Sequence, residues 1–426
     1  MSTSEARDGG VLRRDLRLID AVAIGLGAII GAGIFVVTGV AARVAGPALV
    51  VGLLVAGVAA ACNALSSAQL AAAYPRSGGT YEYGYQVLSP RFGFAAGWLF
   101  LVSKMAAGGT VALGFGASVA ALWPAVPQRA AGVVAAVLLT AANYVGVKKA
   151  GRINTAVVAV SVSVLVVFVV AGISAFERTN LSPFAPAGIR GMLEAAALLF
   201  FAYTGYARVA TLGEEVHEPH KTIPQAIVIA LSVSFVLYVA VSVIAVGAIG
   251  AEAMGRAGSP LQAAAAVFPM KGMAQIVGVG AMTAMLGVLL SQVFGISRMV
   301  FAMARKHDLP RGLEHVHSVY AVPDRGVLLA GAVIIAVALV GALTWVVAAA
   351  TFTILVYYTI TNLAALRMPT EKKLYPNWIP SLGLAFCLIL AGSQRRTTIV
   401  SGLALLAVGF GLRMVLHRSR ADARGN

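Results

Sequence analysis

The stretch Gly25-Leu-Gly-Ala-Ile-Ile-Gly-Ala-Gly-Ile-Phe35 lies in the middle of the first long apolar segment and contains four glycines. Inside a bilayer every backbone N–H and C=O group needs an internal partner, because hydrocarbon offers none. A transmembrane helix that unwinds at this depth exposes polar backbone, which is stable only beside a cavity, an ion or a polar ligand. The stretch is therefore predicted to break its helix and to form part of a binding site.

The whole chain has the composition of an integral membrane protein. Of its 426 residues 59% are hydrophobic and 11% are charged, and the mean hydropathy is +0.88, whereas soluble domains carry about 25% charged residues. The apolar runs have the length of helices and lack the alternation of a transmembrane β-barrel. We therefore predict an all-α membrane protein with twelve transmembrane helices. These are expected at residues 18–42, 47–73, 93–122, 130–147, 153–176, 191–216, 224–250, 273–303, 326–343, 345–366, 379–393 and 397–416.

The placement of charge predicts the orientation of these helices. The net charge is +16, and most of the 32 Lys and Arg residues fall in the loops on the side of the N-terminus. This distribution matches the positive-inside bias of membrane proteins, so the charge reflects topology and not nucleic-acid binding. We expect a multi-pass protein of the cell inner membrane, without a cleaved leader, whose tails 1–17 and 417–426 are both cytoplasmic.

Chemistry other than transport has little support in the sequence. Cys62 and Cys387 lie in apolar segments, and His315 and His317 lie in a loop without carboxylate or cysteine company. Neither a metal site nor a cofactor is expected from this pattern. The apolar segments also lack a nucleophile paired with a base, so we do not expect an enzyme.

A second interruption is predicted in the sixth segment, at Phe200-Phe-Ala-Tyr-Thr-Gly-Tyr206. The first and sixth segments are five apart, and in an alternating topology a five-helix unit that is repeated once reappears inverted. Broken helices at matching positions of inverted halves mark the central site of secondary transporters. We predict these halves at 18–176 and 191–366, followed by two further helices at 379–416. The spacing Gly27-x-x-x-Gly31 alone also fits close helix packing, and the second break favours a binding site.

Five stretches, in order along the chain, resemble the amino acid–polyamine–organocation transporter superfamily, in particular its bacterial amino acid permeases. The resemblance implies a twelve-helix, five-plus-five inverted-repeat fold with discontinuous helices 1 and 6. It also implies secondary active transport of an amino acid by alternating access. The stretches are Gly27–Phe35, Tyr74–Tyr81, Gly146–Asn154, Phe201–Gly205 with Glu214, Glu215 and Thr222–Pro224, and Ser297–Arg305 with Leu309-Pro310.

The same resemblance implies a backbone site for the substrate. The substrate carboxylate is expected at the free amides where helix 1 restarts, at Ala32 and Gly33. The positive end of a half-helix dipole favours an anion there. The substrate ammonium is expected at carbonyls where the first half-helices end, and Tyr203 is expected to cap the substrate. The predicted substrate-binding residues are Ile29, Ile30, Gly31, Ala32, Gly33, Phe201, Ala202, Tyr203, Thr204 and Gly205.

Two departures from the family pattern concern coupling and selectivity. Ser161 stands where many proton-coupled relatives carry a lysine in helix 5, and Ser103 stands where cationic-amino-acid relatives carry a glutamate in helix 3. Lys104 lies deep in helix 3, where a lysine costs about 2.5–3.5 kcal/mol on insertion scales. It is interpreted as a proton carrier, as a structural ion-pair partner or as a side chain that snorkels to a helix end. Arg208 follows the second break, where it either repels cationic substrates or pairs with Glu214 and Glu215.

These features predict a transporter of a neutral or acidic amino acid that works as a proton symporter. Sodium-coupled symport and ion-independent exchange of amino acids or amines stay open as alternatives, so the expected coupling ion is H⁺ or Na⁺. The expected partners are the small-molecule substrate and the lipid bilayer.

Overall fold

The computed structural model describes residues 16–74, 78–146, 150–210 and 216–425. Over these ranges the chain is almost entirely helical, and its only extended pairing is an isolated bridge between Leu16 and Val216. The all-α membrane class is therefore confirmed, whereas the count of twelve spans and the inverted repeat stay predictions. Within the described ranges, seven helical stretches are long and apolar enough to cross a membrane: Leu18–Ala73, Pro90–Leu122, Asn154–Ala175, Pro219–Arg256, Met273–Arg305, Leu343–Arg367 and Arg396–Leu416.

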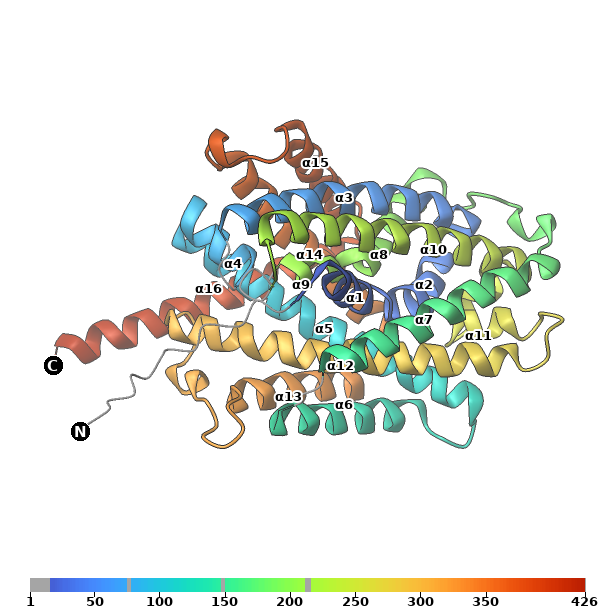
Figure 1. The fold of residues 1–426 in the computed structure, drawn as a ribbon, viewed down its shortest axis with the longest axis horizontal. Coiled ribbons are helices and arrows are strands. Elements are labelled where there is room, and N and C mark those ends of the chain that lie inside the picture. Colours follow the sequence, from blue (N-terminus) through green and yellow to red (C-terminus); the bar gives the residue numbers. More distant parts are fainter. Residues whose placement is uncertain (1–15, 75–77, 147–149, 211–215, 426) are drawn as a thin grey trace.

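The first apolar segment is broken where its glycines predict a break. Helix α1 (Leu18–Ile29) ends before Ile30, whose backbone is extended at φ −75° and ψ 106°. The chain becomes helical again in a π-helical turn, η1 (Gly33–Val37), and continues as α2 (Thr38–Ala45). Figure 1 shows α1 near the centre of the helical bundle.

The second predicted break is milder than the first. Helix α8 (Gly188–Tyr203) tightens into a 3₁₀ turn, η6 (Thr204–Tyr206), and α9 (Ala207–Ala210) follows directly. The turn keeps local hydrogen bonds, since the Thr204 hydroxyl donates to the Phe201 carbonyl at 2.9 Å. The backbone here is therefore tightened and not opened, because a 3₁₀ turn re-satisfies groups that full unwinding would expose.

Glycines allow the two breaks to touch. A Cβ atom at Gly33 would lie 2.6 Å from the Cα of Ala202, and one at Gly205 would lie 2.2 Å from the carbonyl oxygen of Ala28. Only a residue without a side chain permits backbone contact this close. The polar backbone of one break is thus held directly against that of the other.

The remaining helices enclose this centre. Helix α5 packs against α12 and α14, and α3 packs against α8 and α10. The interior is one large apolar cluster to which nearly every long helix contributes. The helices are α3 (Leu49–Ala73), α4 (Thr80–Tyr83), α5 (Pro90–Leu122), α6 (Gln128–Val145), α7 (Ala150–Gly172), α10 (Pro219–Arg256), α11 (Pro260–Ala265), α12 (Met273–Arg305), α13 (Asp324–Val340), α14 (Leu343–Arg367), α15 (Trp378–Gly392) and α16 (Arg396–Gly425).

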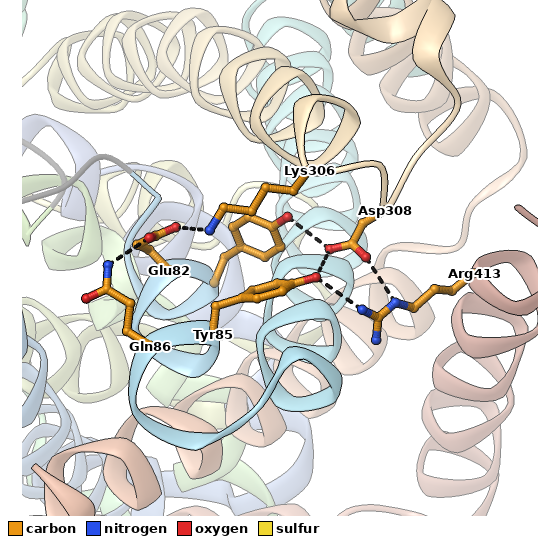
Figure 2. Close-up of polar contacts among 7 residues, drawn as sticks. Glu82, Tyr85, Gln86, Lys306, Asp308 and Arg413 are labelled. Atoms are coloured by element: carbon orange, nitrogen blue, oxygen red, sulfur yellow. Dashed lines mark hydrogen bonds and ion pairs between the residues drawn. The ribbon is translucent and has the colours of Figure 1, made fainter. Parts of the chain in front are cut away.

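A polar cluster ties three distant parts of the chain together (Figure 2). The hydroxyls of Tyr81 and Tyr85, near α4, both donate to Asp308, which follows α12. Arg413 of α16 places its Nε atom 3.0 Å from the second oxygen of Asp308. We call these four residues the Asp308 cluster. Burial is the main cause that raises the pKa of both tyrosines above the ordinary value, and the Asp308 charge adds to it.

Candidate functional site

A buried cavity of about 30 Å³ lies where the two helix breaks meet. Its walls come from four places: the break after α1, the break after α8, the middle of α5 and the middle of α12. The lining residues are Ala28, Ile29, Gly31, Ala32, Gly33, Lys104, Val111, Phe201, Ala202, Thr204, Gly205, Val288 and Gln292.

Eight of the ten predicted substrate-binding residues line this cavity, and the exceptions are Ile30 and Tyr203. Ile30 is buried in the apolar core. The Tyr203 ring packs against the rings of Phe235 and Tyr238 on α10, with centroids 6.4 Å and 5.3 Å away. Tyr203 thus contacts α10 and not the cavity, and its capping of the substrate stays a prediction.

The backbone on the two sides of the α1 break has opposite polarity. The carbonyl end of α1 is electronegative, and the amides that begin the next helical turn are electropositive. The Ile29 carbonyl accepts a hydrogen bond of 2.7 Å from the Tyr238 hydroxyl, and the Ala202 carbonyl lies 3.5 Å from the same oxygen. Tyr238 therefore links the carbonyl groups of both breaks.

The sequence prediction missed Tyr238 and Gln292. Both are polar residues within otherwise apolar helices, α10 and α12, which is a signal that the sequence does contain. The signal alone does not say which face of a helix meets the cavity. That requires the packing of α10 and α12 against the broken helices.

Lys104 and Gln292 bring polar side chains to the cavity from α5 and α12. Both residues are nine-tenths buried, with exposures of 9% and 8%. The Lys104 ammonium lies 5.8 Å from the centre of the Phe100 ring. Within the described ranges neither side chain has a hydrogen bond or an ion pair. The interpretation of Lys104 as a partner in an ion pair thus finds no counterpart among the described residues.

The other coupling and selectivity candidates lie outside the cavity lining. The Ser103 hydroxyl donates to the Ala350 carbonyl of α14 at 2.9 Å, and the Ser161 hydroxyl donates to Val157 of its own helix at 2.7 Å. The Arg208 guanidinium packs closely on Gly295 of α12. Glu214 and Glu215 lie outside the described residues, and so do residues 1–15 of the N-terminal tail.

The cavity is closed in this structure. A volume of about 30 Å³ leaves room for only a few water molecules, so an amino acid does not fit without movement of the walls. A larger cavity of about 510 Å³ lies between the C-terminal end of α5, α11 and the start of α12. It is lined by no charged side chain and by no residue of either break, so its chemistry is less suited to a zwitterion.

The described residues contain no group of three His, Cys, Asp or Glu side chains that would hold a metal ion. The polar groups that line the cavity are peptide groups, the Thr204 hydroxyl, one lysine ammonium and one carboxamide. Such a set has the chemistry to bind a small polar molecule.

Comparison with known proteins agrees with this chemistry. The profile of the amino acid permease family matches residues 20–410. An uncharacterized transporter of Mycobacterium tuberculosis is 43% identical over 96% of this chain and 93% of its own length. The methylthioribose transporter of Bacillus subtilis is 35% identical over 76% of this chain and 74% of its own length. The branched-chain amino acid permease of the same organism is 28% identical over 96% and 94%.

The profile match spans most of the chain and includes both helix breaks. The chain therefore belongs to the amino acid permease family, within the amino acid–polyamine–organocation superfamily.

Proposed function

We propose that this protein is a secondary active transporter that moves a neutral or acidic amino acid across the inner membrane by alternating access. Twelve helices in two inverted halves, with both termini cytoplasmic, form the scaffold of this proposal. The observation that carries it is the contact of two helix breaks at a buried cavity, because exposed peptide groups at bilayer depth require a polar ligand.

The two ends of the broken helices recognise the two charges of an amino acid. The substrate carboxylate binds the amides at Gly31, Ala32 and Gly33, where the start of a helical turn favours an anion. The substrate ammonium binds the carbonyls of Ile29 and Ala202 and takes the place of the Tyr238 hydroxyl that now contacts them. The closed cavity must widen for this, so binding is coupled to movement of the surrounding helices.

Lys104 supplies the proton coupling in this proposal. A lysine buried beside the substrate changes its charge more readily than one in water, which suits a proton carrier. The cation that acts on it electrostatically is Arg208. Ser161 leaves helix 5 without the lysine of many relatives, so sodium-coupled symport and ion-independent exchange are the competing mechanisms.

The names of the relatives support a small polar substrate. One relative is named for methylthioribose and another for branched-chain amino acids. The second name fits the proposed backbone site, because branched-chain amino acids carry the α-ammonium and α-carboxylate that the two breaks are proposed to read. Methylthioribose carries neither group, so the first name supports a small polar substrate only in general.

Uptake into proteoliposomes tests the proposal. Purified protein is reconstituted, and uptake of a panel of labelled amino acids is measured under a proton gradient, a sodium gradient or neither. Accumulation driven by the proton gradient is expected. Accumulation driven by the sodium gradient alone would identify Na⁺ as the coupling ion, and counterflow without net uptake would identify an exchanger. Failure to move any amino acid under all three conditions would refute the transport function.

A further inference from the structure

We propose that Lys104 and Gln292 form a subsite that binds the side-chain carboxylate of an acidic amino acid. This inference rests on the proposed function and narrows its substrate class. The starting observation is that two polar side chains, each nine-tenths buried, line the same small cavity without a hydrogen bond or ion pair to any described residue.

A lysine buried in this way is either neutral or kept charged by an anion beside it. Removing a charge from water costs several kcal/mol in real proteins, and an anion beside it offsets that cost. None of the residues that line the cavity is Asp or Glu. Arg208 adds a repulsive cation to the surroundings of Lys104. An anion that keeps Lys104 charged therefore has to enter with the substrate.

The α-carboxylate of the substrate is not this counterion. It is already bound by the backbone amides at Gly31–Gly33, on the wall formed by the broken helix. Lys104 and Gln292 belong to other walls, α5 and α12. They are thus placed to meet the distal part of the substrate, which carries the side chain.

Gln292 completes the recognition of a carboxylate. Its carboxamide has two N–H donors and one carbonyl acceptor. A donor from Gln292 and one from the Lys104 ammonium together satisfy both oxygens of a carboxylate, and hydrogen bonds of this ionic kind are about twice as strong as neutral ones. A substrate with a side-chain amide would accept these hydrogen bonds more weakly than one with a carboxylate. A substrate with a branched aliphatic side chain would leave the Lys104 ammonium unpaired in a desolvated site.

The first experiment needs no variant. The labelled substrate is the amino acid of the transport panel that is taken up best, and its counterflow into proteoliposomes is measured with unlabelled competitors. Glutamate is compared with glutamine and aspartate with asparagine, and leucine is the apolar reference. Each acid and its amide have nearly the same shape and differ in charge. We expect each acid to compete at least about tenfold better than its amide, which corresponds to about 1.4 kcal/mol. Equal competition, or stronger competition by the amides or leucine, would overturn the subsite.

Variants then assign the preference to the two residues. Lys104→Met is expected to remove the preference for the acid while counterflow of neutral amino acids persists, and Lys104→Arg is expected to retain it. Gln292→Glu supplies an internal carboxylate for Lys104 and is expected to reverse the preference in favour of the amide. Lys271→Met, at an exposed lysine before α12, is the matched control and should leave the ratio unchanged.

The outcomes separate this inference from the proposed function. If Lys104→Met weakens all substrates equally, the ammonium binds the α-carboxylate and the subsite is refuted. If the protein moves neutral amino acids and not acids, transport stands and the subsite fails. If no amino acid is moved, the proposed function itself fails. Size-exclusion profiles of the detergent-solubilised variants identify misfolded protein, and the wild-type panel decides the question without them.

Discussion

At the scale of single residues, the Tyr238 hydroxyl occupies the position that we assign to the substrate ammonium. Tyr238→Phe removes this hydroxyl and little else, so the Ile29 carbonyl loses a buried donor at 2.7 Å. Such a loss costs about 1–3 kcal/mol. We expect a lower thermal midpoint in detergent and a larger stabilisation by added substrate than in the wild type. Tyr144→Phe, at a half-buried tyrosine of α6, should change neither value. An equal substrate-induced shift in wild type and Tyr238→Phe would contradict the assignment.

A single substitution also decides the role of Lys104. Lys104→Met removes the one ionisable side chain among the described residues that line the cavity. We expect it to abolish uptake driven by a pH gradient and to leave exchange partly intact, because exchange requires binding and movement without net proton transfer. Uptake and exchange are measured in the same proteoliposomes. Normal accumulation by Lys104→Met along a proton gradient would mean that the lysine is structural.

At the scale of helical elements, the contact between the two breaks depends on Gly205. A Cβ atom there would lie 2.2 Å from the carbonyl oxygen of Ala28, which belongs to the backbone and cannot rotate away. Gly205→Ala is expected to destabilise the protein by about 1–3 kcal/mol, the usual cost of overpacking, and to abolish transport.

The matched control for Gly205→Ala is Gly411→Ala on α16. A Cβ atom at Gly411 meets nothing within 4 Å, and alanine favours a helix over glycine by about 1 kcal/mol. Thermal midpoints and uptake are measured for both variants. Equal behaviour of the two would show that the close approach of the breaks is not required.

The two breaks also indicate how far sequence predicts this site. Four glycines in one apolar segment predict the α1 break, because glycine weakens a helix whatever packs around it. The second break is predicted at the right place, but it is a 3₁₀ turn, since the depth of unwinding depends on neighbouring backbone at Ala28. Gln292 and Tyr238 were missed because the face that a helix turns to the centre depends on long-range packing.

At the scale of the whole molecule, the Asp308 cluster attaches the last helix to the bundle. Over its apolar part, Arg396–Leu416, α16 buries only 11% of its most apolar window. Among the described contacts, the Trp98 indole donates to the Leu405 carbonyl at 2.8 Å, and Arg395, directly before α16, pairs with Glu194 of α8 at 3.0 Å. Arg413 is the charged residue within α16 that joins the helix to Tyr85 and Asp308 (Figure 2).

The contribution of this attachment follows from the burial of its charges. Asp308 is 1% exposed and Arg413 is 14% exposed, and removing one partner of a buried pair costs about 3–5 kcal/mol because the other charge loses its partner. Asp308→Asn and Arg413→Met are each expected to lower stability by this amount, and the double variant by less than the sum.

The exposed pair Glu252–Arg256, 78% exposed on both sides, is the control and should contribute at most about 1 kcal/mol. Denaturant unfolding of the detergent-solubilised protein measures the three variants of Asp308 and Arg413 and, for the control pair, Glu252→Gln, Arg256→Met and their double. Additive effects at Asp308 and Arg413 would mean that the two side chains act independently and that their pairing does not hold α16 in place.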